Sequence, residues 1–360
     1  MAGASVASLP MSDGGAPATS ERRRRLLGIK LRALVSEHLG VRVDAEPIEF
    51  GTGAGLVVAG AAWVIVDGPA SRTLGASLVW AIRQHATSLD VVVDREGGQL
   101  ARRVAAFDFP IRIWFPAERT LLPVIAEAAP PIPKATAEHL ELVPLIEAGG
   151  ATPLVERGIV TGDVRGLEVC RVVDEPTVGH FAELNDVPAD MITTPSEGVI
   201  LEVGVGATDR EAFQLIHGHV PKVDALADVV AAVTDYRSVE AIQHPLNRMA
   251  PERFLRWQVQ ENPSLLGLTD LAPVDPPVPR QSMKYPEPCV ARGVDAAGAP
   301  VAVVISSGVD LDLIPFVADV ALSLPDEIDR VLIVVPERDL VAATRDLAAL
   351  LDRPVELIGM

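Results

Sequence analysis

The chain carries the stretch WVIVDG at residues 63–68, an apolar run that ends at a glycine, and the similar stretch VAVVISSG at residues 301–308. Such nearly continuous apolar runs are typical of parallel strands whose two faces are both covered by helices. Further apolar runs follow each stretch at intervals of roughly 25 residues, which leaves room for a crossover helix; they lie at 89–93, 111–115, 331–335 and 355–358. The sequence therefore predicts an α/β fold of two related lobes, with mostly parallel or mixed sheets covered by helices.

The composition is typical of a folded protein with more than one domain. The chain has 360 residues, of which 49% are hydrophobic but only 4% aromatic, so its cores must consist mainly of Ala, Val, Leu and Ile. No charge-free apolar run reaches the length of a membrane span, and the basic stretch at 22–25 is not followed by the apolar run of a signal peptide. The two cysteines, Cys170 and Cys289, are too few for a disulfide framework. We therefore expect a cytoplasmic protein.

The charge balance bears on the partners of the protein. The formal net charge is −18, from 49 acidic and 31 basic residues. Such a charge repels the phosphates of nucleic acids, so it disfavours a nucleic-acid partner without excluding a local basic groove. The four arginines at 22–25 fit the exposed side of a first helix. A homo-oligomer is compatible with the sequence.

Composition shifts along the chain predict its domains. Residues 1–19 are rich in Ala, Gly, Ser and Pro and are expected to form a disordered tail. A first α/β lobe should follow at 20–128, and the Pro-rich residues around 131 should link it to a second lobe at 134–360. A further Pro-rich linker is expected at 272–279. We expect the strands after this linker to extend the sheet begun by the strands around Glu168 and Glu202, because the closing segment is small.

Polar residues gather between a predicted strand and the helix that follows it. Glu202 lies near the strand end, Asp209 and Glu211 lie in the first helical turn, and His217 and His219 lie near the end of the helix. Carboxylates and imidazoles that converge at such an edge can hold Mg²⁺ or Mn²⁺, and also Zn²⁺. The alternative is that the acidic residues stabilise the helix start and the histidines its end, through the helix dipole.

The order helix–strand–strand–strand–helix–strand, with acidic residues on adjacent strands, resembles the core of restriction-endonuclease-like enzymes. The resemblance implies that Asp163 or Glu168 is the first acid and Glu202 the second, that these acids hold Mg²⁺, and that a lysine aligns the attacking water. Together with Asp209, Glu168 and Glu202 are the candidate catalytic residues. The lysine that follows the second acid in these enzymes is replaced by Gly204, so the resemblance favours a relative that has lost catalysis.

The turn after the strand at 301–305 resembles the phosphate-binding loop of ATP pyrophosphatases. Its small residues Ser306, Ser307 and Gly308, followed by Asp310, could let backbone N–H groups hold a nucleotide phosphate. The alternative is a tight strand-to-helix turn in which Asp310 caps the next helix.

Arginines are also concentrated around a predicted helix at 251–260. Arg248, Arg253 and Arg256, together with Trp257, could form an anion-binding face. They could equally pair with the excess carboxylates of the chain, and we favour this second interpretation.

Three functional hypotheses follow. The first is a non-catalytic binding or scaffold protein with a degenerate nuclease-like fold, because each catalytic pattern is incomplete. The second is a metal-dependent phosphodiesterase or nuclease centred on Glu168, Glu202 and Asp209. The third is a nucleotide-binding enzyme that uses the turn at 306–310.

Overall fold

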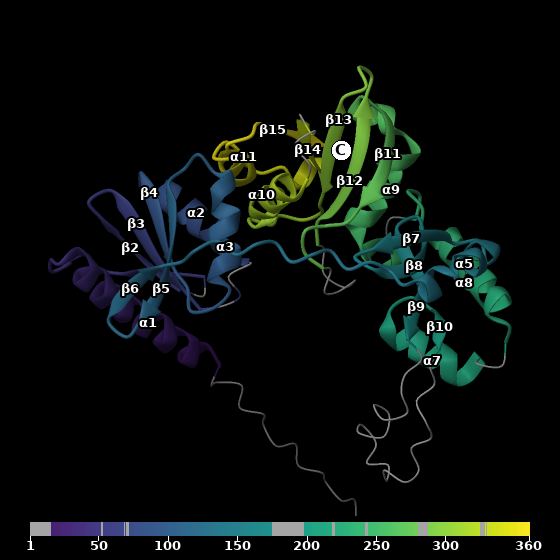
Figure 1. Ribbon diagram of the computed structural model, residues 1–360, viewed down its shortest axis with the longest axis horizontal. Coiled ribbons are helices and arrows are strands. Elements are labelled where there is room, and N and C mark those ends of the chain that lie inside the picture. Colours follow the sequence, from purple (N-terminus) through teal and green to yellow (C-terminus); the bar gives the residue numbers. More distant parts are fainter. Residues whose placement is uncertain are drawn as a thin grey trace, which may run out of the picture. The chain divides into compact units, whose positions relative to one another are not determined.

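The computed structural model divides into two compact units (Figure 1). Unit 1 comprises Met1–Ala129 and Asp346–Arg353, and unit 2 comprises Pro130–Arg345 and Pro354–Met360. The structure describes residues 16–360 apart from 52, 68, 70–71, 175–197, 218–219, 242–243, 280–286, 325–327 and 329. The expected disordered tail at 1–19 lies mostly outside the described residues, and its last residues are helical instead, because the first helix already begins at Ala16.

Unit 1 is built on one mixed sheet of six strands in the order β1-β2-β3-β4-β5-β6. The first three strands pair antiparallel, β3, β4 and β5 pair parallel, and β5 and β6 pair antiparallel. Its elements are α1 (Ala16–Leu39), β1 (Ile48–Phe50), β2 (Gly53–Val58), β3 (Ala61–Val66), α2 (Leu74–Arg83), β4 (Ser88–Val92), α3 (Gly97–Arg103), β5 (Ile111–Ala117) and β6 (Thr120–Pro123).

Helices cover both faces of this sheet, as the apolar runs predict. On one face, Leu31 and Leu34 of α1 pack in a buried cluster with Trp63 and Ile65 of β3. On the other face, Trp80 of α2 lies against Gly55, where a Cβ atom would come within 2.6 Å of the indole ring. Gly55 is therefore required for the close approach of α2 to β2. Strand β3 is apolar throughout because its faces are covered, whereas β4 carries the buried Asp90 and β5 carries the exposed Arg112.

The last five strands of unit 2, here called the closing sheet, repeat the same order and directions. Strands β11, β12 and β13 pair antiparallel, and β13, β14 and β15 pair parallel. The elements are α9 (Pro251–Glu261), β11 (Leu268–Val274), β12 (Cys289–Asp295), β13 (Pro300–Ile305), α10 (Leu313–Ser323), β14 (Arg330–Val335), α11 (Ala342–Ala348) and β15 (Val355–Gly359). Every residue of β13 from Val301 to Ile305 is buried, so both faces of this strand are covered.

The other four strands of unit 2, here called the middle sheet, correct one prediction. They pair antiparallel in the order β10-β9-β8-β7 and are separate from the closing sheet. The expectation that the closing strands extend the sheet of Glu168 and Glu202 is therefore wrong. The elements around this sheet are α4 (Ala137–Leu140), α5 (Val143–Ala148), β7 (Thr152–Glu156), β8 (Ile159–Val164), β9 (Leu167–Asp174), β10 (Val199–Val203), α7 (Ala207–His217) and α8 (Lys222–Tyr236).

The closing sheet is completed by β11 and β12 instead. Of the Pro-rich stretch expected to be a linker at 272–279, residues 272–274 belong to β11 and pair with β12. Proline is tolerated in β11 because this strand lies at the edge of the sheet, where the missing N–H faces outward. The composition rule for linkers therefore misassigned an edge strand.

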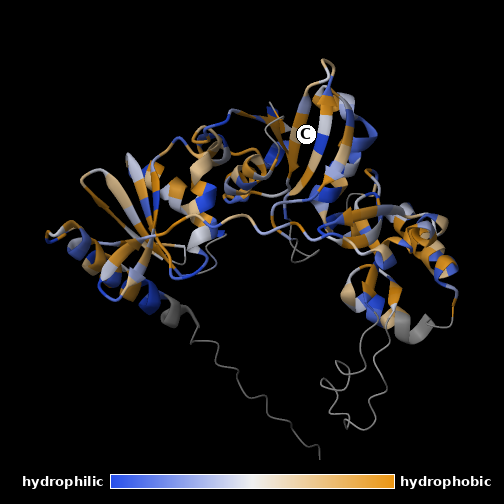
Figure 2. Ribbon diagram, in the orientation of Figure 1, coloured by the Kyte–Doolittle hydropathy of each residue, from blue (hydrophilic) through white to orange (hydrophobic). Residues whose placement is uncertain are grey.

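Hydrophobic residues follow the strands of both units, as Figure 2 shows. Three buried clusters correspond to the three sheets, and Val, Leu, Ile and Ala predominate in them. None of the helices among the described residues has the length and apolar character needed to cross a membrane. The structure thus bears out an α/β protein with helix-covered sheets.

Candidate functional site

Two of the three candidate catalytic carboxylates, Glu168 and Glu202, lie on the middle sheet, and arginines bind them there. The Glu168 side chain on β9 is only 5% exposed, and Arg171 donates to both of its oxygens, from Nε at 2.9 Å and from Nη2 at 2.8 Å. A register shift in the pairing of β8 with β9, between Gly162 and Asp163, accompanies this arrangement. Such bulges reorient side chains, which explains how two residues three apart on a strand can bond to each other.

A second arginine joins Glu168 to Glu202. Arg210 of α7 is buried, and its Nη1 donates to Glu168 Oε1 at 2.8 Å while its Nε donates to Glu202 Oε2 at 3.2 Å. The two acids therefore do come together on adjacent strands, as the sequence suggests. They share a guanidinium, however, so positive charge already occupies the space between them.

Gly204 explains why the lysine of the nuclease pattern has no counterpart in this chain. Its φ is +138°, a conformation that side-chain-bearing residues rarely adopt. A Cβ atom there would also come within 2.9 Å of the backbone nitrogen of Arg210 and of Asp209 Oδ2. The tight turn into α7 therefore requires glycine, and the position cannot hold a lysine without a change of the backbone.

The remaining predicted metal ligands are dispersed. Asp209 is exposed, and its Oδ2 accepts a hydrogen bond from the Val205 N–H at 2.7 Å, which stabilises the start of α7. Glu211 is exposed on the same helix. The side chain of His217 and the whole of His219 lie outside the described residues. Within the part of the chain that the structure describes, no three His, Cys, Asp or Glu side chains are grouped so that they could hold a metal ion.

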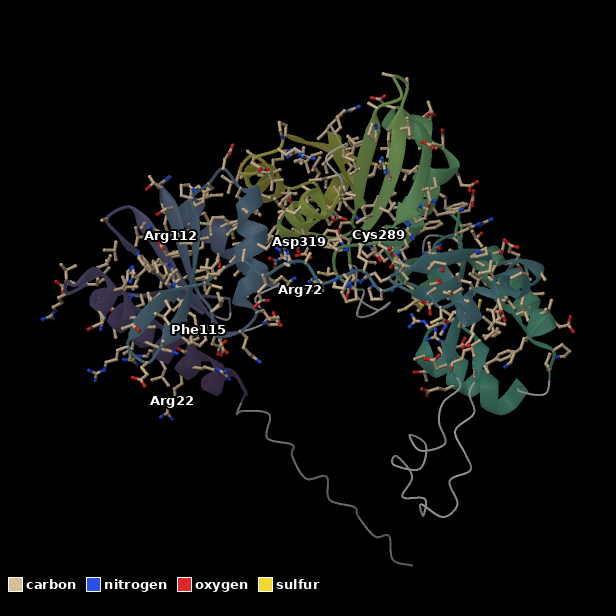
Figure 3. The ribbon with its side chains drawn as sticks, viewed as in Figure 1. Arg22, Arg72, Arg112, Phe115, Cys289 and Asp319 are labelled. Atoms are coloured by element: carbon tan, nitrogen blue, oxygen red, sulfur yellow. The ribbon has the colours of Figure 1, made fainter. Side chains whose placement is uncertain are left out.

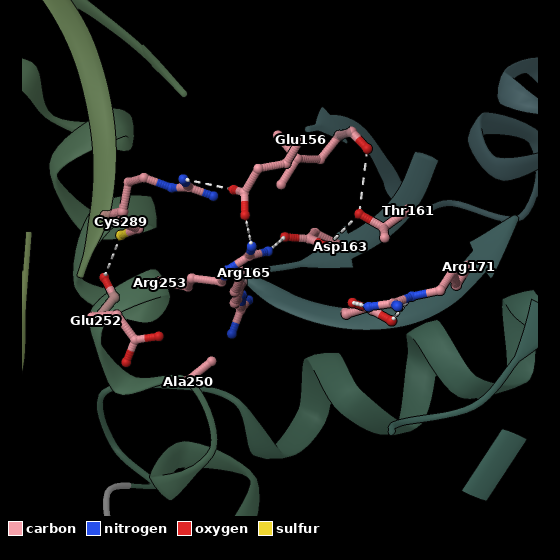
Figure 4. Close-up of polar contacts among 12 residues, drawn as sticks. Glu156, Thr161, Asp163, Arg165, Arg171, Ala250, Glu252, Arg253 and Cys289 are labelled. Atoms are coloured by element: carbon pink, nitrogen blue, oxygen red, sulfur yellow. Dashed lines mark hydrogen bonds and ion pairs between the residues drawn. The ribbon is translucent and has the colours of Figure 1, made fainter. Parts of the chain in front are cut away.

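A second charged cluster lies where α9 meets the middle sheet (Figure 4). Arg253 donates to Glu156 Oε1 of β7 and lies 3.5 Å from Asp163 Oδ2 of β8. Arg256 is 3.6 Å from Glu156 Oε2, an ion-pair distance without a hydrogen bond. The interpretation that Arg253 and Arg256 pair with carboxylates of this chain is therefore confirmed, and their guanidinium groups are not presented to an outside anion.

Burial dominates the electrostatics of this cluster. It raises the pKa of Asp163 above 3.8, and the charges of Arg253 and Arg256 oppose this rise only in part. Burial would lower the pKa of Arg253, but the charges of Asp163 and Glu156 outweigh burial, so the pKa of Arg253 is raised. Asp163 is therefore harder to ionise than an exposed aspartate.

In the turn at 306–310, two of the backbone N–H groups that could hold a phosphate already donate to other groups of this chain. The Ser306 N–H donates to the Val334 carbonyl at 3.0 Å, and the Gly308 N–H donates to Asp339 Oδ2 at 2.8 Å. A phosphate at Gly308 would have to displace this carboxylate, which also repels it. Asp310 accepts from the Asp312 N–H at 2.9 Å, but α10 begins one residue later, so its N-cap is Asp312 and not Asp310.

The two cysteines give a testable consequence of burial. Cys170 lies in β9. Cys289, which Figure 3 labels, is the first residue of β12. Desolvation raises the pKa of the Cys170 thiol to about 12 and that of Cys289 to about 11. At pH 8 the thiolate fractions would be about one in ten thousand and about one in a thousand.

We expect Cys170 and Cys289 in the folded protein to react with Ellman's reagent far more slowly than free cysteine, and both to react at once in denaturant. The measurement is the rate of thionitrobenzoate release, with Cys170→Ser and Cys289→Ser variants to assign each phase. Rapid release from the native protein would contradict the burial of these thiols.

The residues that sequence reasoning missed are arginines. Arg210 links Glu168 and Glu202, and Arg237 is fully buried, yet neither was singled out. The available signal was the position of Arg210 between the acidic residues Asp209 and Glu211. An arginine between two exposed acidic residues in the first turns of a helix could have indicated an ion pair with carboxylates of the preceding strands. Arg237 carried no comparable signal, because its partners are backbone carbonyls.

Comparisons of the chain with models of known protein families, with curated proteins and with solved structures each found no significant match. The functional argument therefore depends on the geometry of the described residues alone.

Proposed function

We propose that this chain is a non-catalytic binding or scaffold protein with a degenerate nuclease-like fold. The observation that carries the proposal is the position of Arg171 and Arg210 on the acids Glu168 and Glu202. A metal-dependent nuclease needs carboxylate oxygens that are free to coordinate a cation. Here the guanidinium groups already provide the positive charge and the hydrogen bonds, so these acids contribute to structure rather than to coordination.

The two five-strand patterns support the scaffold interpretation. Strands β1 to β5 of unit 1 and strands β11 to β15 of unit 2 share their order and their pairing directions. In both, a helix precedes the first strand and crossover helices connect the parallel strands. We infer that the two lobes are related, and that their shared function is to present surfaces for binding. Fold similarity alone does not carry an activity from one lobe to the other.

The proposal predicts that Mn²⁺ and Mg²⁺ leave the melting temperature of the protein unchanged. A resident metal present at about 100 times its dissociation constant would stabilise the fold by about 2.7 kcal/mol, an effect that thermal melting detects readily. The measurement compares wild type, Glu202→Ala and the matched control Glu211→Ala, which removes an exposed carboxylate from the neighbouring helix. None of the three should respond to either metal.

Two other outcomes would replace the proposal. A metal-dependent rise in melting temperature that is lost in Glu202→Ala but kept in Glu211→Ala would favour the metal-dependent phosphodiesterase or nuclease hypothesis, with Glu168, Glu202 and Asp209 as its centre. A rise with ATP that is lost in Gly308→Val would favour nucleotide binding at the turn of Ser306, Ser307, Gly308 and Asp310.

A further inference from the structure

The closing sheet has one strand fewer than the sheet of unit 1, although the first five strands of each follow the same pattern. In unit 1 the fifth strand, β5, carries β6 antiparallel on its outer side, with Phe115 opposite Leu122. In the closing sheet the fifth strand, β15, is the last. Among the described residues no strand pairs with its outer side. The position that corresponds to β6 is therefore open along β15.

The direction of each backbone group of β15 follows from one hydrogen bond. The Met360 N–H donates to the Val335 carbonyl of β14 at 2.9 Å. Since the N–H and C=O groups of successive strand residues point to alternate sides, Glu356 and Ile358 also face β14. Val355, Leu357 and Gly359 then direct their N–H and C=O groups outward. The structure gives these groups no partner among the described residues.

The outer side of β15 lacks the features that protect other edges. Protein edges are blocked by proline, by lysine, by bulges or by shortness. Strand β1 has only three residues, β6, β7 and β11 contain Pro123, Pro153 and Pro273, and β11 also has a register shift. Strand β10 lacks proline, but it follows residues 175–197, which the structure does not describe. Strand β15 reads VELIG, with neither proline nor lysine.

The single charge on β15 is already balanced. Arg330 Nη2 of the neighbouring strand β14 donates to Glu356 Oε2 at 2.8 Å. Glu356 therefore repels an incoming strand less than a free carboxylate would. The flanking residues Leu357 and Ile358 are half-buried, one on each face of the sheet, and each would gain cover from a neighbouring strand.

We propose that two copies of this chain associate through β15, with the two strands antiparallel about a two-fold axis at Leu357. This register places Leu357 opposite Leu357 of the second copy, and Val355 opposite its Gly359. The outward-facing residues Val355, Leu357 and Gly359 then all lie in hydrogen-bonded pairs. In each pair, the two opposite residues exchange two N–H···O=C bonds. Glu356 lies opposite Ile358 of the second copy, so the two carboxylates are never directly opposed.

The self-complementarity of this register is the reason that the second copy is the preferred occupant. An antiparallel neighbour is also the arrangement that β6 adopts on β5 in unit 1. Pairing of one five-residue strand buries less than the roughly 1,000 Å² expected of a tight interface, so the dimer should be weak and depend on concentration. The net charge of −18 on each copy opposes association, and salt should therefore strengthen it.

The test is sedimentation velocity of the full chain from about 1 to about 500 µM, a range that covers weak two-fold association. Wild type should shift from monomer to dimer, and more so when the salt rises from about 0.05 to about 0.5 M. The variant Leu357→Pro removes an outward N–H but keeps the Glu356, Ile358 and Met360 bonds to β14, so it should fold and stay monomeric. Glu356→Gln is the matched control and should still dimerise.

A second variant and an amide-exchange measurement distinguish loss of dimerisation from a folding defect. Leu357→Lys keeps the backbone donor but places two like charges opposite each other, and it should also stay monomeric. In wild type, the Leu357 amide should exchange slowly with solvent only at high concentration, whereas the Ile358 amide should be protected throughout. A monomeric wild type across the range, or a dimer that both Leu357 variants retain, would overturn the proposal.

Discussion

Replacing Arg237 by methionine is expected to destabilise unit 2 by about 4 kcal/mol, since each buried acceptor left without a donor costs about 1–3 kcal/mol. Arg237 is fully buried. Its Nε donates to the Arg165 carbonyl at 2.9 Å, and its Nη1 donates to the carbonyls of Leu246 and Met249 at 2.6 and 2.9 Å. Its Nη2 reaches the Ala250 carbonyl at 3.1 Å, so one side chain joins three separate chain segments.

The position of Arg237 explains why this cost should be large. The Ala250 carbonyl belongs to the residue that precedes α9, where φ is +44°. The guanidinium also lies over the ring of Phe254, at 4.9 Å from its centroid. Loss of Arg237 therefore loosens the start of the helix that carries Arg253 and Arg256, and with it the contact between the closing and middle sheets.

The four tryptophans of the chain allow this prediction to be measured by unit. Trp257 lies in unit 2, whereas Trp63, Trp80 and Trp114 lie in unit 1. Fluorine NMR of protein labelled with 5-fluorotryptophan, followed through a urea titration, reports each indole separately. In Arg237→Met the Trp257 signal should change at a clearly lower urea concentration than in wild type. The unit 1 signals serve as the internal reference.

Arg165→Met is the matched control for this experiment. Arg165 also donates to backbone carbonyls, at 3.3 Å to Thr234 and at 2.7 Å to Arg237, but it is half-exposed. Water can replace its donors, so its loss should cost only about 1 kcal/mol. Equal effects of Arg165→Met and Arg237→Met would show that burial of the carbonyl partners does not decide the cost.

The second large effect is expected for Glu168→Gln, which should destabilise unit 2 by about 3–5 kcal/mol, the usual result of removing one partner of a buried ion pair. The substitution keeps the shape of the side chain but leaves Arg210, whose side chain is 8% exposed, with Glu202 as its remaining carboxylate partner. Urea unfolding followed at Trp257 measures the loss. Adding Arg210→Met should recover part of it, because the unpaired charge is then removed as well.

Asp163→Asn is the matched control for Glu168→Gln, since both replace a buried carboxylate by its amide. Burial raises the folded-state pKa of Asp163 above 3.8, so the folded protein binds this proton more tightly than the unfolded chain. The stability that Asp163 contributes is therefore fully present below pH 3.8 and decreases as the pH rises through its folded-state pKa. At pH 7, Asp163→Asn should lower the free energy of unfolding less than Glu168→Gln does. The stability of Asp163→Asn should also lack this decrease with rising pH. A larger cost for Asp163→Asn would contradict the dominance of burial.

Much of the α/β framework could be predicted because its signals are local. The apolar runs at 63–66, 301–305 and 331–335 became β3, β13 and β14, and helices connect them as their spacing requires. Strands β7, β8 and β12 were missed because each mixes apolar residues with polar residues or glycine, so that their pairing partners decide their structure. Proline in β11 was taken for a linker, because the sequence does not show which strand lies at an edge.

The candidate site shows most clearly what the sequence determines and what only the tertiary structure decides. The sequence by itself determined that Glu168 and Glu202 lie on strands, that an arginine-rich helix follows, and that the chain is rich in carboxylates needing partners. Only the tertiary structure decided that Arg171 and Arg210 occupy these acids, and that Arg237 holds four carbonyls. Strand and helix formation depend on the periodicity of neighbouring residues, whereas ion pairs and buried hydrogen bonds depend on which distant segments come together.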